Sequence, residues 1–496
     1  MRVSFDLNSV DDYRRFLAIK QLPKYRIQGR TAEFPDEYAE RLGLHATPEA
    51  EIVYRPHPAM FDYQRDITRL ALEKKRFAFF WDCGLGKTLA FLEWCRHVRE
   101  VLPEGRKILI VSPLMVVGQT CGEWARFWPD AKPLDVVPAS GLRQWLKKKP
   151  DPWEQNIGIT NWDALRDDTE AGCLGALVLD ESSMLKSHYG KHGRKAIDLG
   201  KGLSWKLACT GTPAPNDRIE YANHAVFLDQ FPTVNAFLAR YFVNRGQTDN
   251  RWELKPHALH PFYRSLSHWC VFLTNPATYG WKDNTENIPP IHVHIHDVEM
   301  TDEQERLTMD CTQSLFAHKI GGITNRAVLA GIGKGFHKGK RIDSRKPAFI
   351  RALVESWPDE STIIWCLYNH EQDLIDEQFP EAASIRGETS HEKRMELIDD
   401  FKAGHRKVLI SKPKILGFGL NLQIATRHVF SGLQDSYESF YQAVKRSNRY
   451  GSILDLNVHI PVTPIELPMV ETVLRKCKMV QQDTDTQEEL FCNATL

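Results

Sequence analysis

The chain has 496 residues, 42% of them hydrophobic and 26% charged, as in ordinary soluble globular proteins. Its 64 basic and 64 acidic side chains cancel, so any surface that binds a polyanion has to be local. Ten cysteines without a C-x-x-C pair argue against zinc and disulfide frameworks, and no apolar run reaches the length of a membrane span. From the length we expect about three domains.

Residues 1–55 predict a small leading module in which no motif indicates a function. The chain starts Met-Arg-Val-Ser-Phe-Asp-Leu-Asn, which lacks the apolar core of a secretory signal. Together with the scattered cysteines, this favours an intracellular location.

The apolar run 77–81 leads into a glycine turn, and an amphipathic stretch follows. This is the setting of a phosphate-binding loop, because the turn and the helix N-terminus present amides to anionic oxygens. Lys87 is then expected to contact the terminal phosphates of a nucleotide, and Thr88 a magnesium ion. Trp81 occupies the place of the first glycine in the G-x-x-x-x-G-K-T pattern, so a strand, turn and helix that only pack in a core stay an alternative.

Two adjacent carboxylates end a second apolar run. Residues 176–179 are fully apolar, as in a strand buried on both faces of a parallel sheet, and Asp180 and Glu181 follow them. Ligands bind at the carboxyl edge of such sheets. Asp180 is expected to hold the magnesium ion, and Glu181 to orient or deprotonate the attacking water. Alone, such a pair is more often a loop start or a helix cap. The phosphate loop upstream favours the catalytic interpretation.

Alternating strand-like and helical patterns predict two α/β lobes with doubly wound parallel sheets. Strand-like runs of the first lobe, residues 56–230, lie at 107–111, 157–160, 176–180 and 207–211. Those of the second lobe, residues 346–475, lie at 362–366, 383–386, 407–411, 428–431 and 457–460. The stretch 231–345 predicts a mostly helical insertion or bridge, and residues 476–496 a frayed acidic tail.

Ordered motifs run through both lobes. In chain order they are Phe61-Asp62-Tyr63-Gln64-Arg65, Ser112-Pro113-Leu114, Thr160-Asn161-Trp162, Asp180-Glu181-Ser182-Ser183, Thr210-Gly211-Thr212-Pro213, Gly387-Glu388-Thr389, Gly417-Phe418-Gly419-Leu420-Asn421 and the stretch from Gln442 through Arg446 and Arg449 to Gly451. The set resembles the Swi/Snf-type branch of the superfamily-two helicase-like ATPases, in a minimal bacterial or phage form. The resemblance implies two tandem RecA-like lobes that use ATP and Mg²⁺.

The resemblance also implies a set of site residues. The expected catalytic residues are Lys87, Asp180, Glu181, Gln442, Arg446 and Arg449. ATP is expected to be bound by Tyr63, Gln64, Gly84, Gly86, Lys87, Thr88 and Gly419, and Mg²⁺ by Thr88 and Asp180. Contacts to a nucleic-acid backbone are expected from Ser112, Thr160, Asn161, Lys186, Gly387, Thr389 and Asn421.

Several positions depart from the family pattern. Ser182 and Ser183 stand where the family usually has Ala-His, which puts the histidine's contacts to the next motif in doubt. The segment 411–414, Ser-Lys-Pro-Lys, replaces the usual Ser-Thr-x-Ala, and Asn448 and Ser452 replace other frequent residues. Every expected catalytic residue is retained, so the sequence predicts an active ATPase.

These observations predict an ATP-dependent DNA translocase in the cytoplasm of a bacterium or a phage-infected cell. Closure of the second lobe would bring Arg446 and Arg449 onto the γ-phosphate, and a lobe that grips a backbone would then step along it. We expect a monomer that binds double-stranded DNA, with single-stranded DNA or RNA as possible tracks and no membrane partner. A strand-separating DNA or RNA helicase and a non-catalytic nucleic-acid clamp are the alternatives, and a partner nuclease or methyltransferase is not indicated.

Two further features have alternative explanations. His292, His294 and His296 lie on one face of a predicted strand, either as the polar face of an edge strand or as metal ligands, and two-residue spacing favours the edge strand. A basic run comprises Lys334, Lys338, Lys340, Arg341, Arg345 and Lys346. It is either a DNA-binding surface or a solvated loop.

Overall fold

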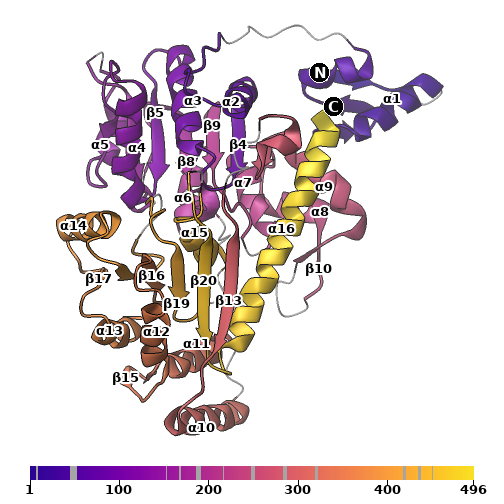
Figure 1. Ribbon diagram of the computed structural model, residues 1–496. Coiled ribbons are helices and arrows are strands. Elements are labelled where there is room, and N and C mark those ends of the chain that lie inside the picture. Colours follow the sequence, from indigo (N-terminus) through magenta and orange to yellow (C-terminus); the bar gives the residue numbers. More distant parts are fainter. Residues whose placement is uncertain are drawn as a thin grey trace. The chain divides into compact units, whose positions relative to one another are not determined.

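A computed structural model describes residues 1–6, 9–44, 53–151, 153–166, 169–185, 191–215, 217–246, 252–282, 288–318, 322–416, 420–433, 437–449 and 451–495. The chain divides into two compact units (Figure 1). Unit 1 is Met1–Asp283 with Gln482–Leu496, and unit 2 is Asn284–Gln481. Each unit contains one parallel sheet.

The leading module is a three-stranded antiparallel sheet with one helix. Its strands are β1 (Arg2–Ser4), β2 (Arg26–Gln28) and β3 (Thr31–Glu33), in the order β1-β3-β2. Helix α1 (Val10–Lys20) begins where the Ser9 side chain accepts a hydrogen bond from the backbone N–H of Asp12, and the short helices η1 (Asp36–Tyr38) and η2 (Glu40–Leu42) follow. Ile19, Leu22, Ala32, Phe34 and Tyr38 form its small core.

Unit 1 is built on a seven-stranded sheet whose strands all run parallel, in the order β12-β4-β9-β8-β5-β7-β6. The strands are β4 (Arg76–Trp81), β5 (Lys107–Ser112), β6 (Asp135–Val136), β7 (Ile157–Asn161), β8 (Leu174–Asp180), β9 (Trp205–Cys209) and β12 (Cys270–Leu273). Successive side chains of β4 point into two different hydrophobic cores. Phe77 and Phe79 pack into one core, and Ala78 and Phe80 pack into the other. Both faces are covered, which is why the strands are apolar throughout.

The helices of unit 1 divide between the two faces. α2 (Asp62–Lys74), α3 (Lys87–Val101) and α4 (Leu114–Phe127) contribute to one core. The other core receives side chains of α5 (Leu142–Lys147), α6 (Lys191–Leu199), α7 (Tyr221–Phe227), α8 (Val234–Tyr241) and α9 (Leu259–Leu266). The remaining elements are the short helices η3 (Trp162–Ala164), η4 (Ser182–Leu185), η5 (Arg218–Glu220), η6 (Pro256–Ala258) and η7 (Pro276–Tyr279), and the hairpin of β10 (Phe242–Asn244) and β11 (Trp252–Leu254).

Unit 2 contains a six-stranded parallel sheet in the order β13-β20-β19-β16-β18-β17. The strands are β13 (Ile291–Asp297), β16 (Thr362–Trp365), β17 (Ala383–Ser384), β18 (Val408–Ser411), β19 (Arg427–Phe430) and β20 (Leu456–Val462). Its helices are α10 (Asp302–His318), α11 (Gly322–Gly333), α12 (Lys346–Glu355), α13 (Asn369–Gln378), α14 (His391–Lys402), α15 (Tyr437–Val444) and the first part of α16 (Leu467–Thr495), which belongs to unit 1 from Gln482 onward. β14 (Phe336–His337) pairs with β15 (Lys340–Arg341). The predicted α/β fold with two parallel-sheet lobes is confirmed.

The structure divides the chain differently from the predicted boundaries. The stretch 231–345 is not a separate insertion, because its β12 is an edge strand of the first sheet and its β13 an edge strand of the second. Residues 476–496 are not a frayed tail, because α16 continues to Thr495. Within unit 1, the buried Glu488 carboxylate on this helix accepts hydrogen bonds from the N–H and hydroxyl of Thr274.

The three histidines of β13 lie on an edge strand, as expected. His292 bonds to Asp455 at 2.8 Å, His294 to Asn457 at 3.0 Å and His296 to His459 at 3.0 Å, all across to β20 and its preceding residue. The described residues contain no cluster of metal-ligating side chains. None of the nine cysteines whose side chains are described forms a disulfide. Among the described helices, none is long and apolar enough to cross a membrane.

The basic run does not form one surface. Lys334 and Lys346 are 2% and 1% exposed and both bind the buried carboxylate of Glu466, so the prediction that they belong to an exposed basic segment is wrong. Arg341 pairs with Glu377 and Arg345 with Glu299. Only Lys338 and Lys340, both exposed in the β14–β15 hairpin, keep the character that a phosphate contact requires.

Candidate nucleotide-binding site

The predicted phosphate loop connects β4 to α3. Gly84 has a φ of 89° and Gly86 a φ of 72°, left-handed values that favour glycine. Helix α3 begins at Lys87, and no side chain caps its first turn. The first amides of the helix are therefore available to an anionic oxygen, as a phosphate loop requires.

Lys87 folds back over this loop. Its ammonium donates to the carbonyl oxygen of Trp81 at 2.8 Å and to that of Asp82 at 3.1 Å. Trp81, the residue in place of the usual glycine, therefore uses its backbone to position the lysine, and its indole is fully buried in the core.

Tyr63 and Gln64 support the same loop from α2. The Tyr63 hydroxyl and the Gln64 amide nitrogen both donate to the carbonyl oxygen of Leu85, at 3.0 and 2.9 Å. The Gln64 amide oxygen accepts from the N–H of Phe61 at 2.9 Å, and the side chain is 2% exposed. In this structure both ends of the amide have protein partners, and adenine recognition by Gln64 stays a prediction.

We predict that Gly86→Ala lowers the free energy of unfolding more than Gly105→Ala does. Both glycines have positive φ, but a methyl group at Gly86 would lie 2.3 Å from the Gln64 amide nitrogen, whereas Gly105 has open space. The displaced amide would lose its bond to Leu85, so Gly86→Ala should cost about 1–2 kcal/mol more. Urea denaturation of the two variants measures the difference. Equal midpoints would show that Gln64 does not support the loop.

Asp180 ends β8 and Glu181 follows it, at the carboxyl edge of the same sheet. β9 lies between β4 and β8, so the phosphate loop and the two carboxylates flank the end of β9. Thr210, directly after β9, donates to the Glu181 carboxylate at 3.3 Å. The sheet thus brings together three predicted motifs that are far apart in the sequence.

Asp180 is held in a buried environment. Its side chain accepts from the Ser112 hydroxyl at 2.7 Å, and its carbonyl oxygen accepts from the Trp162 indole at 3.0 Å. Burial raises the pKa of Asp180, against the opposing effects of Ser112 and the nearby Lys87. A cation beside this carboxylate would offset the cost of its burial.

The residues at this edge fit a magnesium ion bound together with a nucleotide. Thr88 supplies a hydroxyl and Asp180 a carboxylate, and oxygen donors are the ligands that Mg²⁺ takes. The absence of a larger acidic cluster among the described residues is compatible with this, because Mg²⁺ commonly keeps waters and uses substrate phosphates as ligands.

Ser182 of the Asp180-Glu181-Ser182-Ser183 motif, called the box from here on, has a partner that the sequence did not indicate. The Ser182 hydroxyl lies 3.1 Å from Nε2 of His224, a fully buried residue of α7. Burial lowers the pKa of His224 to about 4, so the imidazole is neutral near pH 7. His224 also packs edge-on against Phe80 of β4. A histidine from a later helix therefore supports the box, and no spacing rule in the sequence could have identified it.

The predicted nucleic-acid contacts of unit 1 have internal partners. Ser112 is fully buried against Asp180, and Thr160 is 1% exposed with its hydroxyl donating to Val137 at 2.8 Å. The Asn161 side chain accepts from the N–H of Ala164 at 3.1 Å and caps η3. Lys186 lies outside the described residues. Contact of these residues with nucleic acid stays a prediction.

Unit 2 carries Gln442 on α15 and the two arginines just after it. Gln442 donates to Glu438 at 3.4 Å. Arg446 is 5% exposed, its carbonyl oxygen accepts from the N–H of Leu422, and Arg449 is partly exposed. The structure therefore brings these residues close to the segment that follows the glycine-rich motif.

A buried hydrogen-bond chain fixes this segment. Trp365 donates to Nδ1 of His428 at 3.2 Å, Nε2 of His428 lies 2.8 Å from the Ser447 hydroxyl, and Ser447 donates to Leu422 at 2.8 Å. Burial, with the charge of Arg446, lowers the pKa of His428 to about 3. The neutral imidazole then donates from Nε2 to Ser447, next to Arg446. Sequence reasoning missed this histidine because it lies within a strand and outside every motif.

Three predicted nucleic-acid contacts in unit 2 lie on its surface. Gly387 and Asn421 are exposed, and Thr389 is partly exposed, with its hydroxyl accepting from the N–H of Arg386. Gly419 lies outside the described residues. The structure leaves a phosphate backbone access to these three positions, which is what their predicted role requires.

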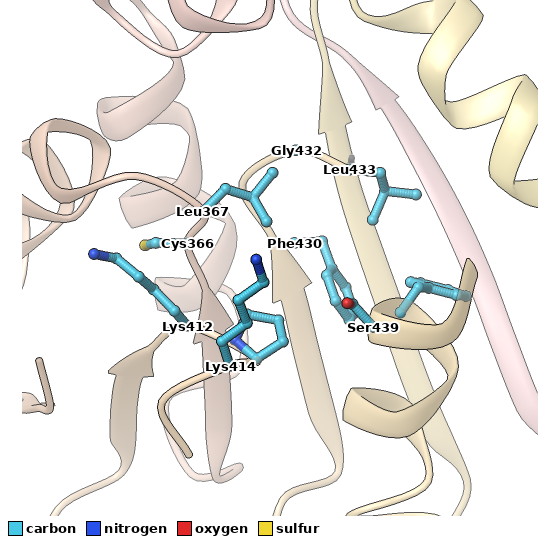
Figure 2. A pocket seen from close by; sticks show the side chains of 10 residues that line it. Cys366, Leu367, Lys412, Lys414, Phe430, Gly432, Leu433 and Ser439 are labelled. Carbon is cyan, nitrogen blue, oxygen red and sulfur yellow. The ribbon is translucent and has the colours of Figure 1, made fainter. Parts of the chain in front are cut away.

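A small pocket lies in unit 2, at the carboxyl ends of β16, β18 and β19 (Figure 2). Lys412 and Lys414 line it together with Phe430 and Leu433, and the ammonium of Lys412 donates to Asn369. Its volume of about 80 Å³ is well below that of ordinary ligand pockets. It is too small for a nucleotide.

The sequence matches two family profiles. The SNF2-related domain covers residues 75–331, and the helicase conserved C-terminal domain covers residues 345–451. The chain belongs to the SNF2-related family. It is a helicase-like ATPase, an ATP-dependent motor, as the predicted motifs indicated.

Relatives of this SNF2-related chain occur in phages and bacteria. Protein p41 of Acyrthosiphon pisum secondary endosymbiont phage 1 is 23% identical over 75% of this chain and 83% of the phage protein. YwqA of Bacillus subtilis, named as an ATP-dependent helicase/translocase, is 23% identical over 82% of this chain and 46% of its own length. Among solved structures, the SWI2/SNF2 ATPase core of Sulfolobus solfataricus in complex with dsDNA aligns with a TM-score of 0.39 and 18% identity, covering 88% of this chain and 96% of that one.

Proposed function

We propose that the chain is a DNA translocase that couples ATP hydrolysis to movement along the backbone of double-stranded DNA. The observation that carries the proposal is the common edge of the first sheet, where the phosphate loop and the two carboxylates flank Thr210. The resemblance to the Swi/Snf-type branch favours duplex DNA as the track. The ATP-dependent helicase/translocase name of YwqA agrees with a translocating motor.

Each residue at the edge has a part in the proposed hydrolysis. Bound Mg²⁺ would neutralise charge on the phosphates, with Thr88 and Asp180 holding it. Lys87 would release the carbonyl oxygens of Trp81 and Asp82 and turn to the terminal phosphates. Glu181, oriented by Thr210, would hold and deprotonate the attacking water. Arg446 and Arg449, steadied by Gln442, would stabilise the charge that develops on the γ-phosphate.

The chain would bind the backbone of the nucleic acid without reading its base sequence. In unit 2, Gly387, Thr389 and Asn421 would contact phosphates. In unit 1, the proposed contacts to the nucleic-acid backbone are Ser112, Thr160, Asn161 and Lys186. Because contact with phosphates fixes register and carries no sequence information, we expect turnover to depend on the kind of nucleic acid and little on its sequence.

ATP turnover measured with duplex DNA, single-stranded DNA and RNA tests the proposal. We expect duplex DNA to stimulate turnover without release of a strand, and Glu181→Gln to abolish the stimulated turnover. Stimulation by single strands together with strand release would instead support a DNA or RNA helicase. A chain that binds nucleic acid and leaves ATP intact with every polymer would be a clamp, and the proposal would be wrong.

A further inference from the structure

A second site is suggested by a cleft in unit 1, between the leading module and the lobe. The cleft has a volume of about 760 Å³, within the range of pockets that hold small ligands. Residues of the leading module, among them Lys24, Tyr25 and Arg26, form one wall, and Phe231, Arg240 and Trp269 lie on the other.

Specific contacts hold the two walls together. The Tyr38 hydroxyl lies 2.5 Å from Nδ1 of the buried His268, and the Glu37 carboxylate lies 3.0 Å from the same nitrogen. Lys24 donates to the amide oxygen of Gln230 at 2.8 Å. The cleft is therefore a built feature of the unit, because groups from both sides are paired at its base.

The lining of the cleft is strongly basic in a chain whose overall charge is zero. Four cationic side chains, Arg2, Lys24, Arg26 and Arg240, face one acidic side chain, Glu33. Burial, together with the nearby Arg76 and Lys74, lowers the pKa of Lys24, against the opposing effects of Glu37 and Asp229. An anion bound in the cleft would relieve this cost.

Flat aromatic side chains lie among these cations. The guanidinium of Arg240 lies 5.4 Å from the ring centre of Tyr25 and 5.9 Å from that of Phe231, so it is held against both rings. Trp269 closes the same cleft. Phosphates bound by lysine and arginine, with bases stacked on aromatic rings, are how proteins hold unpaired nucleotides.

The cleft is separate from the ATP site. His268 and Trp269 precede β12, at the amino end of that strand, whereas the phosphate loop follows the carboxyl end of the neighbouring parallel strand β4. The leading module also lies ahead of residues 75–331, which match the SNF2-related domain. A ligand in the cleft would therefore be an addition to the motor.

We propose that this cleft binds nucleotide units, the phosphates on Lys24, Arg26 and Arg240 and the base against Tyr25 or Phe231. The bound nucleotide units belong either to an unpaired segment of nucleic acid or to a free nucleotide, because both carry the same phosphate and base. The proposal does not depend on ATP hydrolysis, and it stands or falls separately from the proposed translocation.

Binding of a fluorescent oligothymidine to the full chain, without ATP and over a range of salt, is the test. Lys24→Gln, Arg26→Gln and Arg240→Gln together should weaken binding about tenfold or more and reduce the salt slope by about 2. Arg14→Gln, Lys149→Gln and Lys201→Gln, which remove three exposed charges outside the cleft in the same unit, are the matched control and should change binding less than twofold. Equal losses in the two triple variants would overturn the proposal.

Two further measurements locate the ligand even if the first triple variant folds poorly. Tyr25→Leu keeps an apolar side chain but removes the stacking ring, and it should weaken binding about fivefold or more. An oligonucleotide containing 5-iodouridine should cross-link on irradiation to residues 24–26 or to Phe231. Full affinity of Tyr25→Leu, or cross-links that map only outside the cleft, would overturn the proposal.

Competition with uridine monophosphate separates the two sources. Displacement of the oligothymidine by a comparable concentration of the mononucleotide would identify a free nucleotide as the ligand. Displacement only by a large excess would identify a segment of nucleic acid. If neither compound binds to the chain in a manner that depends on Lys24, Arg26 and Arg240, the cleft is not a nucleotide site.

Discussion

Glu181→Gln is expected to lower nucleic-acid-stimulated ATP turnover by a factor on the order of 10²–10⁴, the contribution of a general base. The amide keeps the shape of the side chain and can still accept from Thr210, which lies 3.3 Å from the carboxylate, so the fold should be retained. Nucleotide affinity should change little, because Lys87 and the loop amides are untouched. Turnover and ATP binding are measured on the same preparation.

Glu100→Gln is the matched control for this prediction. Glu100 lies near the end of α3, is 60% exposed and pairs with Arg96, so the same chemical change falls in the same unit away from the sheet edge. Its turnover should equal that of the unchanged chain. If Glu181→Gln retains comparable turnover, another group activates the water and the proposed role of Glu181 is wrong.

Glu466→Gln is expected to destabilise unit 2 by about 3–5 kcal/mol, the cost of removing one partner from a buried ion pair. The Glu466 carboxylate is 1% exposed and binds Lys334 at 2.6 Å, Lys346, and the N–H and hydroxyl of Thr463. Without its charge, two ammonium groups would remain buried with no carboxylate between them. Hydrogen exchange of the segments around Lys334 and Glu466 measures the local free energy of opening.

This cluster also predicts how stability depends on pH. Burial alone would raise the pKa of Glu466, but Lys334 and Lys346 bring it down to about 2, from 4.5. Because the pKa is lower in the folded state, the stabilisation is complete above about pH 4.5 and is lost as the pH falls toward 2. In the Glu466→Gln variant, the free energy of unfolding should therefore fall less steeply between about pH 4.5 and pH 2 than in the unchanged chain.

Glu377→Gln provides the comparison for the buried cluster. Glu377 pairs with Arg341 at 2.7 Å, but the two side chains are 52% and 64% exposed. The substitution should therefore lower the free energy of unfolding by less than about 1 kcal/mol. Replacing Lys334 and Lys346 by Met and Glu466 by Leu together should cost less than Glu466→Gln alone, because no unpaired charge stays buried. If Glu377→Gln and Glu466→Gln have equal effects, the cluster does not stabilise the unit.

The parallel sheets could be predicted because their central strands are buried on both faces. The runs 176–179 and 363–365 are apolar at every position, and such runs predict inner strands whatever surrounds them. The edge strand β13 lacks this signal. It has a largely exposed burial pattern, so alternating histidines and apolar residues did not reveal that it belongs to the second sheet. The other missed edge strand, β12, is buried and apolar, but its run of four residues was too short to stand out among helical patterns.

Side-chain partners were the least predictable part of the site. Gln64 is expected to bind ATP, and nothing in its motif indicated that its amide also bonds to Leu85 of the loop and to Phe61. Lys334 and Lys346 looked like members of an exposed basic run, and a single carboxylate far along the chain, Glu466, buries both of them. His224 supports the box from another helix. None of these partners lies within the motif that it completes.

The sequence alone determined that the chain is a helicase-like ATPase. The order of the motifs, the apolar strands and the residues for ATP chemistry are local patterns, which can be recognised without knowing which residues pack against them. Only the tertiary structure decided which groups face each other. It placed the end of β9 between the phosphate loop and the carboxylates, and it packed the leading module against the lobe to form a basic, aromatic cleft. The physical reason is that burial and long-range pairing set the partner of a polar side chain, and residues distant in the sequence supply both.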